Sequence, residues 1–435
     1  MTNVQSLTPV TRDEKYPVFG IIVVLALNYL SPFVSNLLPL VAMLLCIVRV
    51  VRYDEKVFAT DYSILISTMM LFQTPGRMSL LVYLCLFADV WYFVRRGVKA
   101  EAAVVLMILL LNYLLLRMQM SIDRFALCFG QLFLLRILLP LQDKRSAERA
   151  AKAFCINLLV ASAYALVFRN TWQIVALRGV EAPAYFGSKV IRFYGPFQDP
   201  NYYAMLLVTA LALLTKLKDS SCIRWGSFLL GSLALIGCGI LTYSKTFFLM
   251  LVLLVAVYLV WQFWNKRVFR GIFMTLAIVI LGGILLFSEG SPFAVVISRL
   301  TSAVDLGDLT TGRSDVFVEY FRAITKSVGS VLFGAGLGAG KLSRDPHNLL
   351  LEISYYVGLV GLVLMVVYYI CLIKAIDANL KQQNFVARYV VLFMVVMVHM
   401  TLHGMTAFPT YASFFMAAVA MLIIPENKEA VPCQD

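Results

Sequence analysis

The chain has 435 residues, of which 61% are hydrophobic and only 14% are charged. A soluble domain is about half apolar and a quarter charged, so this composition excludes a water-soluble enzyme. The 37 Lys and Arg residues against 24 Asp and Glu residues give a net charge of +13. In a membrane protein such an excess indicates basic cytoplasmic loops rather than binding to nucleic acid.

Apolar runs bounded by polar clusters recur along almost the whole chain. They predict about 12–14 transmembrane helices, with 14 as the preferred number, although several runs are shorter than the roughly 20 residues that a perpendicular helix needs. The predicted spans are 18–34, 36–51, 60–72, 78–94, 102–116, 125–140, 153–168, 202–217, 223–241, 246–263, 271–287, 349–373, 387–402 and 404–424.

The distribution of Lys and Arg orients these spans. With a cytoplasmic N-terminus, 22 of the 37 cations fall in cytoplasmic segments. The short outer loops hold only four, which are Arg77, Arg117, Arg124 and Lys245. This asymmetry follows the positive-inside rule, so we predict an all-α, multi-pass membrane protein with both termini in the cytoplasm.

Two long connections, 169–201 and 288–348, both fall on the outer side of the membrane. Loops of this length in a compact architecture are usually functional or disordered. They divide the chain into N-terminal transmembrane helices (1–168), a first outer loop (169–201), central transmembrane helices (202–287), a large outer loop (288–348), and C-terminal helices with a cytoplasmic tail (349–435).

The large outer loop is expected to contain short helices. Ser291 and Pro292 are typical of a helix start, and a second helix is predicted to begin near Ser314. Such helices would lie along the bilayer surface or cap a cavity, while plain packing over the bundle is an open alternative. The second helix is predicted to carry one apolar face made of Phe317, Tyr320, Phe321 and Ile324.

Short polar motifs follow one another through the outer loops and the helices beside them. They are Arg192 with Gly195 and Asp199-Pro200-Asn201, then Tyr243-Ser244-Lys245-Thr246, then Thr311-Gly312-Arg313-Ser314-Asp315, then the glycine-rich stretch 333–341, and finally Asp345-Pro346-His347-Asn348 followed by Glu352 and Gly358. In this order, over roughly residues 185–365, the chain resembles the O-antigen ligase/polymerase family of membrane glycosyltransferases.

The resemblance implies a C-type glycosyltransferase fold and a glycan donor carried on undecaprenyl diphosphate. It implies metal-independent, inverting transfer at the outer face of the bacterial inner membrane, without nucleotide sugar, metal or other cofactor. The implied partners are the lipid-linked donor, a glycan or lipid A–core acceptor, the bilayer, and a chain-length regulator or other polysaccharide assembly proteins. No nucleic acid is expected as a partner.

The candidate residues fit that task on chemical grounds. A diphosphate leaving group needs its developing charge stabilised, and arginine pairs bidentately with phosphate oxygens, so Arg192 and Arg313 are placed at the diphosphate. His347 is the candidate general base for the acceptor hydroxyl, since its ordinary pKa lies near neutrality. Lys245 stands where relatives often carry arginine and would supply a point charge. The remaining candidate substrate-binding residues are Tyr243, Asp199, Asn201 and Asn348.

Each of these residues also has a purely structural interpretation. Outer arginines commonly contact lipid phosphates, a helix-end lysine can extend toward the interface, and His347 could serve as a cap. Pairs of Asp or Asn with proline also mark ordinary turns. Arg136, within a predicted span, is interpreted as an interior salt-bridge or cavity residue.

Two further patterns resemble binding motifs but predict no site. His399 and His403 are spaced for a metal pair, but no third ligand lies in their segment, so no metal site is predicted. The stretch 333–341 fails the phosphate-loop pattern because Ala335 replaces the first glycine and Leu342 replaces Ser or Thr. A flexible loop that shapes a cleft is the preferred interpretation.

The sequence therefore predicts a polymerase that joins undecaprenyl-diphosphate-linked repeats into O-antigen, capsule or exopolysaccharide. A ligase that transfers finished glycan to lipid A–core is an alternative, because the two activities share one reaction and differ only in acceptor. A flippase for the same lipid-linked glycans is the alternative of another class, although the internal symmetry common in transporters is not visible.

Overall fold

The computed structural model describes parts of the chain that lie mainly between residues 144 and 379. The described residues are 144–168, 180–183, 189–195, 199–264, 313–336 and 348–379, with isolated positions at 91, 105–106, 109–110, 112–113, 272, 301, 339, 342–343, 346 and 424. Several of the predictions concern positions outside the described residues. These are His347, Arg136, His399, His403, the expected helix at Ser291 and most of the predicted spans. The described part is all-α apart from one two-stranded hairpin.

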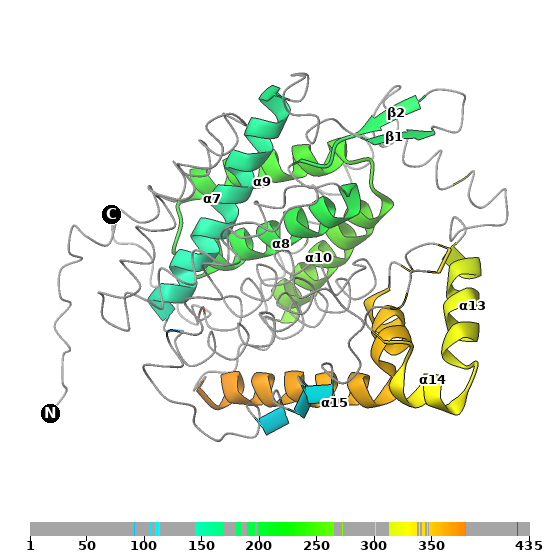
Figure 1. Ribbon diagram of the computed structural model, residues 1–435. Coiled ribbons are helices and arrows are strands. Elements are labelled where there is room, and N and C mark those ends of the chain that lie inside the picture. The colour runs from blue at the N-terminus through cyan, green and yellow to red at the C-terminus, as the bar shows by residue number, and fades with distance from the viewer. Residues whose placement is uncertain are drawn as a thin grey trace, which may run out of the picture.

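A first group of helices packs around α8. It consists of α7 (Lys144–Phe168), α8 (Pro200–Asp219), α9 (Trp225–Leu241) and α10 (Lys245–Trp264), and α8 contacts the other three (Figure 1). The predicted helices at 202–217, 223–241 and 246–263 are confirmed as helices. The helix predicted at 153–168 begins earlier, at Lys144, because the basic segment before it continues the same helix.

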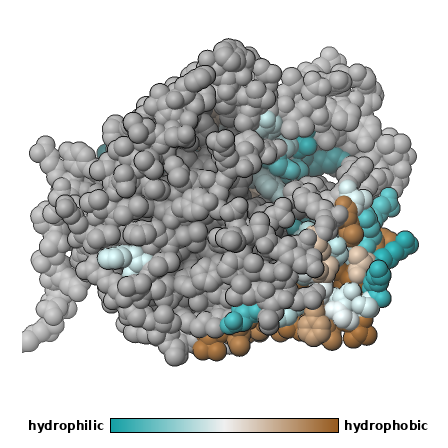
Figure 2. All heavy atoms as spheres, in the orientation of Figure 1, coloured by the Kyte–Doolittle hydropathy of each residue, from teal (hydrophilic) through white to brown (hydrophobic). Residues whose placement is uncertain are grey.

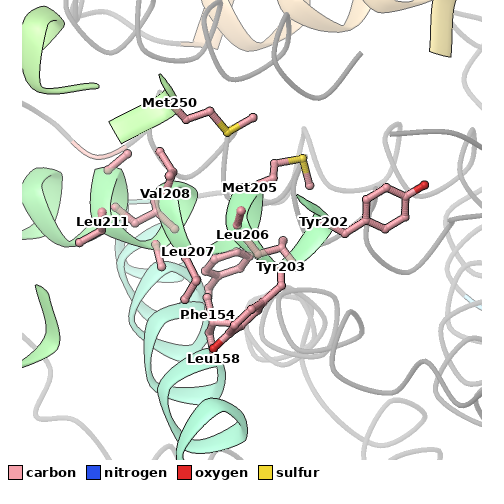
Figure 3. Close-up of a cluster of buried hydrophobic side chains, with 14 of the residues drawn as sticks. Phe154, Leu158, Tyr202, Tyr203, Met205, Leu206, Leu207, Val208, Leu211 and Met250 are labelled. Atoms are coloured by element: carbon pink, nitrogen blue, oxygen red, sulfur yellow. The ribbon is translucent and has the colours of Figure 1, made fainter. Parts of the chain in front are cut away.

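The core of this group lies between α7 and α8. Figure 3 shows Phe154 and Leu158 of α7 beside Tyr203 and Leu207 of α8, and all four are fully buried. Tyr203 donates a hydrogen bond from its hydroxyl to Ser162 Oγ of α7 at 2.6 Å. A buried tyrosine hydroxyl needs such a partner, so this bond fixes the alignment of α7 against α8.

A glycine in α9 lets α10 approach closely. A Cβ atom added at Gly239 would overlap the ring of Phe247, which is fully buried on α10. We therefore expect Gly239→Ala to lower the free energy of unfolding by roughly 1–3 kcal/mol through overpacking. Unfolding in mixed detergent micelles with increasing dodecyl sulfate would measure this.

Gly237 provides the matched control for that substitution, since it lies in the same helix and a Cβ added there would meet nothing within 4 Å. Gly237→Ala should leave stability unchanged or raise it slightly, because alanine is the better helix former. Equal effects of the two alanines would contradict the packing of α10 against Gly239.

The segment predicted as the first outer loop contains a β-hairpin that the sequence did not predict. Strand β1 (Val180–Pro183) pairs antiparallel with β2 (Lys189–Arg192), with Val180 opposite Arg192. Directly after β2, the backbone N–H of Phe193 donates to the carbonyl of Leu241 at 3.0 Å. The end of the hairpin is therefore fixed to the C-terminal end of α9.

A second group contains α13 (Arg313–Ile324), α14 (Val328–Phe333) and α15 (Leu349–Asn379). The helix predicted near Ser314 is confirmed as α13. Its predicted apolar face is partly wrong, because Val316 and Tyr320 are buried while Phe321 is 63% exposed. The reason is that α15 packs against the side of α13 that carries Tyr320, and the rings of Tyr320 and Tyr355 meet at 5.1 Å.

Helix α15 is interrupted where the sequence predicts a continuous span at 349–373. Gly358 has φ 66° and ψ −172°, which are not helical values. The helix thus consists of a short half, 349–357, and a long half, 359–379, which we call the outer and the inner half after their predicted orientation. Figure 1 shows α15 turning sharply at the end that lies beside α14.

Two of the described helices are long and apolar enough to cross a membrane, namely segments Ala147–Val167 and Leu350–Tyr368. Trp225–Leu241 and Lys245–Val260 are apolar but shorter. A core helix of a soluble protein can have the same length and composition, so the multi-pass arrangement stays a prediction.

Candidate functional site

The side chain of Arg192 is held at the corner between α9 and α10. Its Nε donates to the carbonyl of Thr242 at 3.0 Å, and its Nη2 donates to Oδ1 of Asn201 at 3.3 Å. Two acceptors from different elements thus orient one planar guanidinium group. A guanidinium fixed in this way is preorganised to pair with phosphate oxygens, because its donors keep a set direction.

Asn201 joins the start of α8 to the start of α10. Its Oδ1 accepts from Arg192 and also from Oγ of Ser244, the latter at 2.7 Å, and Ser244 directly precedes α10 and is fully buried. Asp199 is the N-cap of α8, where its Oδ1 accepts from the backbone N–H groups of Asn201 at 2.6 Å and Tyr202 at 3.3 Å. The carboxylate of Asp199 therefore caps α8, and substrate binding by Asp199 stays a prediction.

The polypeptide between α9 and α10 has an uncommon conformation. Tyr243 has φ 46°, in the left-handed region that residues other than glycine seldom occupy. Such residues are concentrated at functional sites, where surrounding contacts compensate for the strain. Here the compensating contacts include the bond from Arg192 to Thr242 and the bond from the Ser244 N–H to Oγ1 of Thr242 at 3.2 Å.

A second basic residue, Lys245, lies at the same corner in the sequence. Lys245 is the first residue of α10, and the first turn of that helix contains no acidic residue. A helix N-terminus already carries partial positive charge, so a lysine there is opposed by the helix dipole unless an anion is nearby. The N-terminus of α8, with its cap Asp199, lies against the same corner through Asn201. We call this set, Arg192, Asn201, Tyr243, Ser244 and Lys245, the basic corner.

The other candidate residues belong to the second group of helices. Arg313 is the first residue of α13, and its side chain lies outside the described residues, as does all of His347. Asn348 precedes α15 and caps it: its Oδ1 accepts from the N–H of Leu351 at 3.1 Å, and its carbonyl accepts from the N–H of Glu352 at 3.0 Å. Substrate binding by Asn348 stays a prediction.

Sequence reasoning missed a bond between α13 and the segment that precedes His347. The carboxylate of Glu319 accepts from the N–H of Ser343 at 3.0 Å and from its hydroxyl. Arg313 begins the helix that carries Glu319, and His347 follows Ser343 by four positions in the sequence. The bond therefore connects the elements that carry two of the candidate catalytic residues. Nothing in the local sequence pattern around Glu319 indicates such a distant partner.

This bond predicts a specific dependence of stability on pH. The Ser343 hydroxyl first, and then its N–H, hold the pKa of Glu319 below its ordinary value of 4.5. Because the folded-state pKa is lowered, the stabilisation is fully present above that ordinary value and is lost as the pH falls through the lowered pKa.

We therefore expect Glu319→Gln to unfold at a lower temperature than the wild type at neutral pH. The difference should vanish at a pH well below 4.5, where the wild-type carboxyl is also neutral. Ser343→Ala, which keeps the backbone donor, should show a smaller difference of the same sign. Thermal unfolding in detergent across this range measures it, and a difference that persists in acid would show that the charge of Glu319 is not involved.

In the described part of the chain, no group of three or more His, Cys, Asp or Glu side chains is placed to hold a metal ion. The polar chemistry of the basic corner instead suits an anion, since it combines a fixed guanidinium with a lysine at the N-terminus of α10.

No protein-family model, curated protein or solved structure matches the chain. The resemblance described from the sequence therefore depends on the polar motifs and their order alone.

Proposed function

We propose that the chain is a bacterial inner-membrane glycosyltransferase of the O-antigen ligase/polymerase type. It joins undecaprenyl-diphosphate-linked oligosaccharide repeats into surface polysaccharide on the outer side of the membrane. The observation that carries this proposal is the basic corner, in which two motifs separated by about 40 residues of sequence come together. Arg192 and Asn201 of the first motif contact the polypeptide of the second at Thr242 and Ser244.

The surface of the helices supports a membrane location. Three apolar helices expose large hydrophobic side chains along much of their length, which a soluble monomer rarely does. Figure 2 shows apolar side chains along the lower edge of the view, where α14 and α15 lie. The exposed residues include Trp225, Leu229, Leu230 and Leu233 on α9, Leu249, Val252 and Val260 on α10, and Leu359, Val363, Val366 and Ile370 on α15.

In this reaction the first group of helices supplies Arg192 and Lys245, and the second group supplies Arg313 and the segment that carries His347. The acceptor hydroxyl attacks the anomeric carbon of the donor sugar, its proton passes to His347, and the bond from that carbon to the diphosphate oxygen breaks. The leaving group is undecaprenyl diphosphate, and the configuration at the anomeric carbon inverts. Arg192, Lys245 and Arg313 stabilise the charge that develops on the diphosphate, which is the contribution such preorganised cations make in enzymes.

The experiment uses the full-length protein in liposomes with lipid-linked repeat units as the only glycan. Wild-type protein should produce a ladder of long lipid-linked chains, while His347→Ala and Arg313→Ala at equal reconstitution should produce none. Full activity in both variants would refute the assignment of those two residues.

The same assay separates the alternatives. Chains that appear only on added lipid A–core would identify a ligase rather than a polymerase. Movement of intact repeats across the bilayer without any new glycosidic bond would identify a flippase and refute the enzyme class.

A further inference from the structure

At the interruption of α15 at Gly358, three consecutive backbone carbonyls accept hydrogen bonds from outside the helix. In a continuous helix the carbonyls of Tyr355, Tyr356 and Val357 accept from residues four positions later. Here Tyr355 accepts from the N–H of Ala335 at 2.7 Å, and Tyr356 accepts from the N–H of Gly336 at 2.8 Å. The glycine-rich segment after α14 therefore caps the outer half of α15.

The third carbonyl, that of Val357, is bonded by a side chain from far away in the sequence. The hydroxyl of Tyr113 lies 2.6 Å from this oxygen and 3.1 Å from the carbonyl oxygen of Phe333, the last residue of α14. A phenol has one hydrogen to donate, so the two carbonyls share it. Tyr113 thus links the end of α14 to the end of the outer half of α15.

The ring of Tyr113 also touches the inner half of α15. A Cβ atom added at Gly361 would lie 3.0 Å from Cε1 of Tyr113, so the absence of a side chain at Gly361 makes room for the ring. One residue therefore contacts all three segments that meet at the break. We call this meeting point, formed by Tyr113, Gly334 and Gly358, the joint. In an apolar helix such an interruption is tolerated only where the released backbone groups find new partners.

We propose that Tyr113 is a positioning residue for the transfer reaction, and this rests on the proposed function above. The joint holds one end of the outer half of α15, and the other end carries Asn348 and the adjoining His347. The outer half, 349–357, is about 13 Å long, so a tilt of about 10° at the joint would move its far end by roughly 2 Å. A misplacement of about 1 Å can reduce catalysis by 10²-fold.

Tyr113→Phe tests this directly, because it removes only the hydroxyl. We expect kcat for chain extension to fall roughly 10-fold, with KM for the lipid-linked repeat changed by less than about 2-fold. Hydrogen exchange should become faster at the amides of Ala335 and Gly336, which bond to the outer half of α15, with little change elsewhere.

Tyr203→Phe is the matched control, since it removes a hydroxyl bond of the same length, to Ser162, in the core of the first group. It should lower stability without lowering kcat. An unchanged kcat in an active preparation of Tyr113→Phe, or a rise in KM alone, would overturn the proposal and leave the proposed function standing.

Failure of the proposed function has a different signature, because the wild type itself would then make no glycosidic bond. In that case the positioning role of Tyr113 in transfer would also be refuted. If Tyr113→Phe and Tyr203→Phe lose stability and kcat in equal proportion, the role of Tyr113 is structural and the proposal is wrong.

Discussion

Alanine at Gly358 or at Gly334 should lower the free energy of unfolding by roughly 3 kcal/mol or more and abolish transfer activity. Both glycines have φ values in the left-handed region, 66° and 70°, and each faces the other's backbone. A Cβ atom at Gly358 would lie 2.5 Å from the N atom of Gly334, and one at Gly334 would lie 2.5 Å from the carbonyl oxygen of Tyr356. Because these contacts are with backbone, no side-chain rotation can relieve them.

The control for both substitutions is Gly329→Ala in α14. A Cβ atom there would meet only Oγ of Ser327 within 4 Å, at an ordinary contact distance of 3.7 Å. It should be as stable and as active as the wild type. Unfolding by dodecyl sulfate in mixed micelles measures the stability of all three variants, and a Gly358→Ala protein as stable as Gly329→Ala would contradict the close approach of the two backbones.

The second large effect is expected at the basic corner. Arg192→Ala should reduce transfer by about 10²-fold or more, because in the proposed reaction it removes a preorganised donor at the charge that develops on the diphosphate. Arg192→Lys should recover part of that loss. Its ammonium group restores the charge but cannot bond to Thr242 and Asn201 with the geometry of the guanidinium fork.

Arg224→Ala provides the matched loss of one positive charge, since Arg224 is exposed and precedes α9 without a side-chain capping bond. It should be fully active. Initial rates of chain extension at saturating donor, together with the thermal unfolding of each variant, separate loss of catalysis from loss of fold. More than half of the wild-type rate in Arg192→Ala would exclude this arginine from the diphosphate site.

The apolar helices of the described part could be predicted from the sequence, because a long apolar segment bounded by polar residues is typical of a helix. The runs at 202–217, 223–241 and 246–263 each become a helix with bounds within a few residues. The motifs at Arg192 and at Lys245 could also be chosen from residue type and order. Their convergence could not, since it depends on the contacts of Asn201 with both Arg192 and Ser244.

The break in α15 shows where sequence reasoning fails and why. A glycine inside an apolar run is compatible with a continuous helix, and the choice depends on whether other groups can satisfy the released carbonyls. Those groups are Ala335, Gly336 and Tyr113, and Tyr113 is separated from Val357 by 244 positions in sequence. The hairpin β1–β2 was missed for another reason: its strands have only four residues each and show no strong alternation of apolar and polar residues.

The central claim, that the chain transfers glycan from undecaprenyl diphosphate, is tested most directly by the stoichiometry of the products. Purified protein in liposomes, washed with a chelator, would be given lipid-linked repeats alone, and the released undecaprenyl diphosphate and the new glycosidic bonds would both be counted by mass spectrometry. We expect one released undecaprenyl diphosphate for each new bond, with inverted anomeric configuration. Consumption of no donor, or strict dependence on an added divalent metal or nucleotide sugar, would contradict it.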